Sequence, residues 1–122
     1  MQFVMVVGTV RMLPLPNRRL EVLEILRSVQ GPVLAQPGCA SCDIYDEEGP
    51  EHAIVFIERW ESREALEAHL RSEMYRRVLG ALELSGGRPD IRFEQVSASE
   101  GMELIERQRL TIGGLNVKGD ES

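Results

Sequence analysis

The stretch at residues 53–60 constrains the fold most, because apolar side chains stand on both faces of one predicted strand. Successive side chains of a strand point to opposite sides, so Phe56, Glu58 and Trp60 share one face while Val55 and Ile57 share the other. Trp60, the only tryptophan of the sequence, ends the strand. The sheet that contains this strand therefore needs apolar cover on both faces.

A helical pattern follows the strand almost at once. The hydroxyl of Ser62 is placed to cap a first helix that carries Leu66, His69 and Leu70. Ser72 is placed to cap a second helix, in which one apolar stripe recurs at helical spacing. The members of that stripe are Met74, Tyr75, Val78, Leu79 and Leu82.

Three further strands and one further helix are predicted elsewhere in the chain. Residues 2–12 are apolar at almost every position and predict a strand, in which Gly8 marks a bulge or a close backbone approach. A helix starts near Arg18 and is interrupted at Gly31-Pro32. Its apolar face holds Val22, Ile25, Leu26 and Val29. Residues 41–46 and 90–96 predict the other two strands, the first joined to residues 53–60 by a hairpin loop.

The region after residue 97 is less regular. Residues 101–107 fit a short helix capped by Ser99, and they fit a strand nearly as well. The glycine-rich end at residues 113–122 is predicted to be mobile.

The predicted order is strand, helix, strand, strand, helix, strand, which is the ferredoxin-like split βαβ arrangement of the α+β class. Two helices cover one face of such an antiparallel sheet. An uncovered apolar second face would exceed the patch that monomers tolerate, so we expect a second copy of the chain to cover it. The sequence therefore predicts a homodimer with a largely apolar cavity between helices and sheet in each subunit.

The net charge and the lack of long apolar runs limit which partners and which cellular locations the sequence allows. The net charge is −6, with both signs interspersed, which argues against nucleic acid and against an anionic membrane surface. The sequence has no apolar run long enough to span a membrane and no basic start typical of a signal peptide. We expect a single-domain cytoplasmic protein.

The cysteines and the short motifs give no sign of a cofactor. Cys39 and Cys42 have redox spacing, but they open a strand, so the helix N-terminus that activates a thiol in thioredoxin-like sites is missing. Two such cysteines and two distant histidines do not make a zinc site. Phosphate loops and dinucleotide fingerprints are absent from the sequence. We therefore expect neither a metal nor an organic cofactor.

Several segments together resemble the antibiotic biosynthesis monooxygenase domain, a family of the dimeric α+β barrel superfamily. They are Pro37-Gly38-Cys39 leading into residues 42–45, residues 57–62, residues 64–69 and residues 72–75. The resemblance covers roughly residues 2–97. It implies an antibiotic biosynthesis monooxygenase-like domain at 1–97 and a C-terminal extension at 98–122 that is partly ordered against the dimer partner.

The resemblance also implies a range of activities. Similar proteins include cofactor-independent oxygenases of electron-rich phenols and anthrones, a quinol oxidase, haem-degrading enzymes and proteins without a demonstrated reaction. The polyketide-oxidising members have an Asn where this chain has Phe56. The haem-degrading branch uses an Asn on the first strand and a His where this chain has Leu70, with His69 one residue away, so haem degradation is not expected.

The candidate site residues follow from the resemblance and from their positions. Phe56, Trp60 and Met74 are the expected substrate-binding residues, although Phe56 and Trp60 also fit a core aromatic cluster. His69 is the expected proton acceptor, with helix packing as its alternative role. Tyr75 is a second catalytic candidate, or a tyrosine at the edge of the core.

Two hypotheses for function remain open at this point. The first is a cofactor-independent monooxygenase or quinol oxidase acting on an electron-rich aromatic small molecule. The second is a non-catalytic dimer of the same fold that binds a hydrophobic small molecule or serves as an accessory protein. Phe56 in place of a polar residue favours the second.

Overall fold

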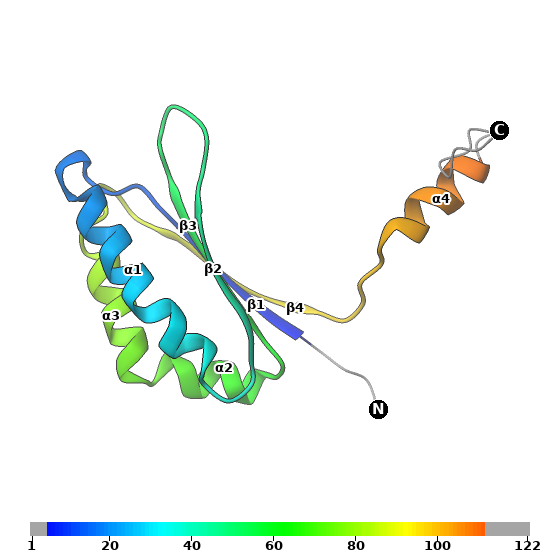
Figure 1. The fold of residues 1–122 in the computed structure, drawn as a ribbon, viewed down its shortest axis with the longest axis horizontal. Helices are drawn as coiled ribbons and strands as arrows, with labels where there is room; N and C mark the ends of the chain where they lie inside the picture. Colours follow the sequence, from blue (N-terminus) through cyan, green and yellow to red (C-terminus); the bar gives the residue numbers. More distant parts are fainter. Residues whose placement is uncertain (1–4, 112–122) are drawn as a thin grey trace.

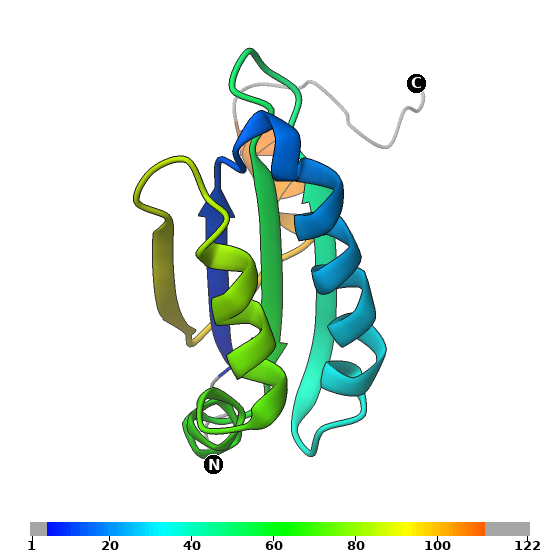
Figure 2. The same ribbon diagram turned by 90° about the vertical axis from the view of Figure 1, so that its left-hand side faces the viewer.

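A computed structural model describes residues 5–111 of the chain. Helices α1, α2 and α3 lie on one side of a four-stranded antiparallel sheet (Figure 1, Figure 2). The strands are β1 (Met5–Met12), β2 (Cys39–Asp46), β3 (Ile54–Trp60) and β4 (Asp90–Val96). The helices are α1 (Arg19–Leu34), α2 (Arg63–Leu70), α3 (Glu73–Leu82) and α4 (Met102–Thr111), with a 3-10 turn, η1 (Pro16–Arg18), before α1. The α+β, ferredoxin-like prediction is confirmed.

The sheet order β2-β3-β1-β4 puts the two most apolar strands in the centre. β1 and β3 pair antiparallel, with Val10 opposite Phe56 and Val6 opposite Trp60. Burial alternates strictly along both strands, because every second side chain points toward the helices. Phe56 and Trp60 are both buried on this side, which is the core of the domain.

Gly8 on β1 marks a close approach, which was one of its two predicted roles. It lies opposite Glu58 on β3 and Phe93 on β4. A Cβ at this position would sit 3.1 Å from two ring carbons of Phe93. The missing side chain therefore lets the Phe93 ring lie over the backbone of β1.

The caps predicted for the helices after Trp60 are confirmed. The Ser62 hydroxyl accepts a hydrogen bond from the backbone N–H of Ala65 at 3.1 Å. The Ser72 hydroxyl accepts one from the N–H of Tyr75 at 3.3 Å. These caps fix where α2 and α3 begin, and hence which of their side chains face the sheet.

The predicted interruption of the first helix at Gly31-Pro32 is wrong. α1 continues through Pro32 to Leu34. Pro32 lies in the last turn, so its missing N–H removes a single helical hydrogen bond. Val33 in the same turn is fully buried, and this packing holds the chain helical past the proline.

The starts of β2 and of the C-terminal helix also differ from the prediction. β2 begins at Cys39, two residues earlier than expected, with an irregularity in register between Cys39 and Ser41. The tail forms a helix rather than a strand, and it starts at Met102, so Ser99 lies too far upstream to cap it. The predicted strand residues 2–4 and the predicted mobile segment 113–122 lie outside the described residues.

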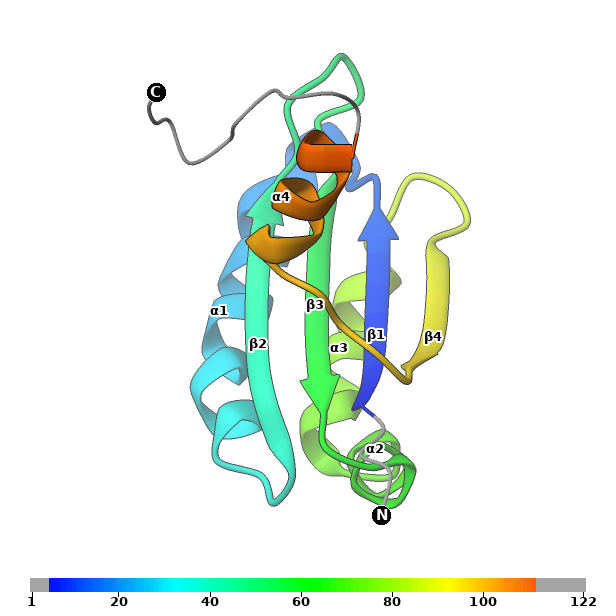
Figure 3. The ribbon, with the colours of Figure 1, turned by 90° about the vertical axis from the view of Figure 1, so that its right-hand side faces the viewer.

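The second face of the sheet carries half-buried apolar side chains, and no helix of the described chain is packed on it. Val7, Val55 and Ile57 point to this side, opposite the core. From the end of β4 the chain crosses in front of this face, and α4 projects away from the domain (Figure 1, Figure 3). Large apolar side chains of α4 are exposed, namely Met102, Leu104, Ile105 and Leu110. Within residues 5–111, none of the helices has the length and apolar character needed to cross a membrane.

Substitution of Gly38, in the turn before β2, tests the close packing of this turn on α2. Gly38 has φ of +84°, and a Cβ there would lie 2.5 Å from the Cβ of Ala65. Gly38→Ala should lower the free energy of unfolding by about 2–4 kcal/mol, because it adds left-handed strain and a clash. Gly80→Ala on α3 is the matched control, since a Cβ there meets nothing within 4 Å. Urea unfolding should show the control unchanged or more stable; equal losses would contradict this packing.

Candidate active site

A carboxylate lies in the core beneath the helices. Glu58 occupies an inward position of β3, between Phe56 and Trp60 on the same face, and is 3% exposed. Its Oε2 lies 2.7 Å from Nε2 of His69, which comes from α2 and is 2% exposed. Because a buried charge is costly without a partner, the two side chains depend on each other.

The second nitrogen of His69 has its own partner. Nδ1 lies 2.6 Å from Oε1 of Gln36, in the turn between α1 and β2. A carbonyl oxygen only accepts, so Nδ1 carries a proton in this arrangement. A proton on Nε2 lets this nitrogen donate to the Glu58 carboxylate, so the buried carboxylate has a hydrogen-bond partner inside the core.

Aromatic rings enclose the imidazole. The Trp60 ring stacks on His69 with a centroid separation of 4.6 Å and an interplanar angle of 28°. Tyr75 of α3 meets it edge-on at 5.2 Å. Burial raises the pKa of the Tyr75 phenol, and the charge of Glu58 raises it further. Tyr75 therefore stays protonated at neutral pH and is suited to donate a hydrogen bond rather than to act as a base.

Trp60 contributes one unsatisfied polar atom. Its indole Nε1 is buried and has no hydrogen-bond partner among residues 5–111. An orphaned buried N–H is unfavourable, and it often marks a place where a ligand or water completes the structure.

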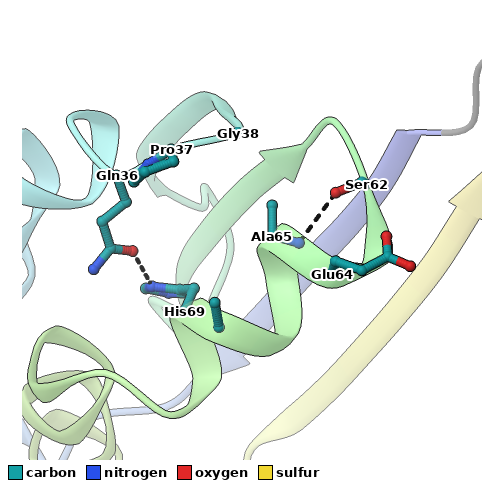
Figure 4. Close-up of a pocket in the computed structure, with 8 residues that line it drawn as sticks. Gln36, Pro37, Gly38, Ser62, Glu64, Ala65 and His69 are labelled. Carbon is teal, nitrogen blue, oxygen red and sulfur yellow. Dashed lines mark hydrogen bonds between the residues drawn. The ribbon is translucent and has the colours of Figure 1, made fainter.

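A cavity of about 490 Å³ lies beside the imidazole (Figure 4). It is bounded by the turn before β2 on one side and by the first two turns of α2 on the other. His69 and Gln36 stand at the same end of it, joined by their hydrogen bond. The lining residues are Gln36, Pro37, Gly38, Ser62, Glu64, Ala65, Ala68 and His69. The volume suits a small organic molecule.

The structure brings together some of the predicted site residues and separates others. His69, Trp60 and Tyr75 form one cluster, and His69 also lines the cavity. Trp60 stands behind the imidazole and is fully buried. Phe56 is buried in the core, and Met74 packs against that core from α3; neither lines this cavity.

Sequence reasoning missed Glu58 and Gln36. A signal for Glu58 was present, because it is a carboxylate on the inward face of a strand whose other inward residues are apolar. Such a position calls for a buried partner, and His69 was the basic side chain expected on the sheet-facing side of the next helix. Gln36 gave no signal, since its contact with His69 spans 33 residues and depends on the tertiary fold.

The cysteines lie next to this cluster but are poor nucleophiles. Cys39 and Cys42 are both free thiols near the start of β2. Burial, reinforced by the charge of Glu58, raises the pKa of Cys39, and it raises the pKa of Cys42 to about 12. Thiolate is therefore scarce at neutral pH. Among residues 5–111, no three His, Cys, Asp or Glu side chains gather closely enough to hold a metal ion.

The fold and the buried Glu58–His69 contact define a ferredoxin-like α+β protein with a cavity between the turn before β2 and α2, rather than the predicted cavity between sheet and helices. The family model for antibiotic biosynthesis monooxygenase matches residues 4–80, more than half of the 122-residue chain. The chain therefore belongs to the antibiotic biosynthesis monooxygenase family. Family and fold together support a monooxygenase-type or small-molecule-binding role.

Solved structures agree with this assignment. The chain is 26% identical to Rv0793 from Mycobacterium tuberculosis, with a TM-score of 0.66, covering 80% of this chain and 98% of that one. A candidate antibiotic biosynthesis monooxygenase from Nitrosomonas europaea is 17% identical, with a TM-score of 0.72 over 83% of this chain and 98% of that one. The second likeness shows the fold alone.

A curated relative of unassigned function also matches. The protein sll1783 of a Synechocystis strain is 27% identical over 60 residues, which is 49% of this chain. The match spans 41% of the length of that relative.

Proposed function

We propose that this protein oxidises an electron-rich aromatic small molecule, such as a phenol, hydroquinone or anthrone, with dioxygen and without a bound cofactor. The observation that carries the proposal is the buried Glu58–His69 pair at the wall of a cavity of about 490 Å³. Such molecules react with dioxygen once they lose a proton. The protein then has to supply a base, an orientation and a site with little water.

His69 is the proposed base, acting through Nδ1 on the cavity side in the proton state in which Nδ1 is bare and Nε2–H donates to Glu58. Glu58 holds Nε2–H and stabilises the positive charge that forms when the imidazole takes a proton from the substrate. This is the relation of a histidine base to the carboxylate that orients it. Because the pair is buried, the attraction between its members is little screened by water.

The oxidation itself uses the electrons of the substrate. A hydroquinone loses two electrons and two protons to dioxygen, which gives the quinone and hydrogen peroxide. A deprotonated anthrone adds dioxygen at its anionic carbon, and loss of water from the resulting hydroperoxide leaves a carbonyl group. Trp60 and Tyr75 pack around the imidazole and do not line the cavity, so their proposed role is to hold His69 in place. Direct substrate contacts by Trp60, Tyr75, Phe56 and Met74 stay predictions.

One observation favours a second candidate function, the binding of a hydrophobic small molecule without catalysis. Both ring nitrogens of His69 already have partners, so the imidazole is fully satisfied without a substrate. Phe56 also adds no polar group to the site. In this alternative the Glu58–His69 pair serves packing and specificity alone.

The homodimer is part of the proposal. The half-buried apolar residues of the second sheet face and the exposed apolar residues of α4 support cover by a second copy. An isolated helix of ten residues is marginal in water, so α4 is proposed to pack on the partner subunit.

The free thiols of Cys39 and Cys42 fit a reducing compartment, and we propose a cytoplasmic location.

Oxygen consumption with a panel of hydroquinones and anthrones tests the catalytic proposal. His69→Asn should reduce the rate by about 10²- to 10⁴-fold, because it removes the base. His52→Asn is the matched control, since His52 is exposed in the loop before β3 and its left-handed backbone suits Asn. Equal rates for wild type and His69→Asn would remove His69 from the mechanism. Binding of the panel without oxygen consumption would favour the second candidate.

Sedimentation velocity tests the proposed dimer. The wild-type protein should sediment as a species of about 27 kDa, twice the 13.7 kDa of one chain. Ile57→Lys should raise the dissociation constant of the dimer about tenfold or more, because it places a charge on the sheet face that the partner subunit is proposed to cover. Leu20→Lys is the control, since Leu20 is 74% exposed on the outer side of α1. A wild-type monomer at micromolar concentration would contradict the proposed dimer.

A further inference from the structure

Gln36 stands between the cavity and the proposed base. Its backbone is held at both ends of the turn, because its N–H donates to the Val33 carbonyl and its own carbonyl accepts from Cys39. Its half-buried side chain reaches His69 along one end of the cavity (Figure 4). The backbone of Gln36 is thus fixed, while its amide borders open space.

The other sides of the imidazole are closed. Glu58 occupies Nε2, Trp60 covers a ring face, and Tyr75 meets the ring edge-on. Of these neighbours and Gln36, only Gln36 also lines the cavity. A molecule in the cavity therefore gains access to a ring nitrogen of His69 only if the Gln36 amide leaves Nδ1.

We propose that Gln36 is the resident partner of His69 Nδ1 and that a hydroxyl group of the incoming aromatic substrate displaces it. This inference rests on the proposed function, and it makes Gln36 a positioning residue that selects hydroxyl-bearing ligands. A ligand without such a group leaves Nδ1 unpaired when it moves the amide aside, and an unpaired buried polar atom is costly. A hydroxyl replaces the lost hydrogen bond.

An amide suits this position because it can serve both proton states of Nδ1. Its carbonyl oxygen accepts from Nδ1–H, as in the structure, and after a half-turn its NH₂ group donates to a bare Nδ1. In the bare state Nε2–H donates to the Glu58 carboxylate. The substrate O–H bond then breaks, an Nδ1–H bond forms, and a phenolate is left in the cavity beside an imidazolium. No electrons change hands in this step.

Two substitutions separate the proposal from a purely structural role. The leucine side chain of Gln36→Leu cannot form a hydrogen bond with Nδ1 of His69. A hydroxyl group of a ligand then has no side chain to displace from Nδ1. Gln36→Glu only accepts when ionised, so it should keep Nδ1 protonated and compete more strongly. Gln95→Leu, an exposed position on β4 away from the cavity, is the matched control.

The displacement of the Gln36 amide from Nδ1 can be followed by nitrogen-15 NMR of histidine-labelled protein. The protein is titrated with 1,4-hydroquinone in the absence of oxygen, so that no turnover occurs. Hydroquinone should shift the Nδ1 resonance of His69 in the wild type. Gln36→Leu should bind hydroquinone about three- to tenfold more tightly, and Gln36→Glu more weakly by a similar factor. The Gln95→Leu control should match the wild type. Gln36→Met replaces Gln36→Leu if that variant does not fold.

Steady-state oxygen uptake adds a second readout. Gln36→Leu should lower KM with little change in kcat, whereas Gln36→Glu should lower kcat. A hydroquinone-induced Nδ1 shift without oxygen uptake would defeat the proposed oxidation and leave the role of Gln36 standing. An unchanged affinity in Gln36→Leu, or an Nδ1 resonance that hydroquinone does not move, would overturn the role of Gln36 even if oxygen is consumed.

Discussion

The contact between Glu58 and His69 is the interaction on which the rest of the structure depends. It joins the central strand β3 to α2 through a 2.7 Å hydrogen bond inside the core. Each side chain would be a costly buried polar group without the other. Held together they satisfy each other, and they set the position of the imidazole against Trp60. The end of the cavity and the orientation of Nδ1 follow from that position.

The site is assembled from segments that are far apart in the sequence. The turn before β2 supplies Gln36 and Gly38, β3 supplies Glu58, and α2 supplies His69. Gly38 matters because its lack of a side chain lets this turn approach α2 at Ala65. The same approach brings Gln36 to Nδ1. The packing of this turn on α2, the access of a ligand to Nδ1 and the proton state of His69 are therefore linked through a few contacts. A substrate that displaces Gln36 from Nδ1 changes all three.

The sequence predicted the parts of the fold that depend on local patterns. Alternating apolar residues placed Phe56 and Trp60 on one face of β3, and the side-chain oxygen of Ser62 marked the start of α2. Local rules failed at Pro32, where tertiary burial of the last turn of α1 outweighs the cost of a proline. The site was predicted in part, since His69 was a candidate from its helical face. Gln36 lay beyond prediction because only the folded chain brings it to the imidazole.

The coupling energy between Glu58 and His69 tests the central claim most directly. It is obtained from urea unfolding of the wild type, Glu58→Leu, His69→Leu and the double variant. If the pair is buried and mutually dependent, each single substitution should cost about 3–5 kcal/mol, and the double variant should cost clearly less than the sum. Costs that add to within about 0.5 kcal/mol would show that the two side chains act independently and would contradict this account.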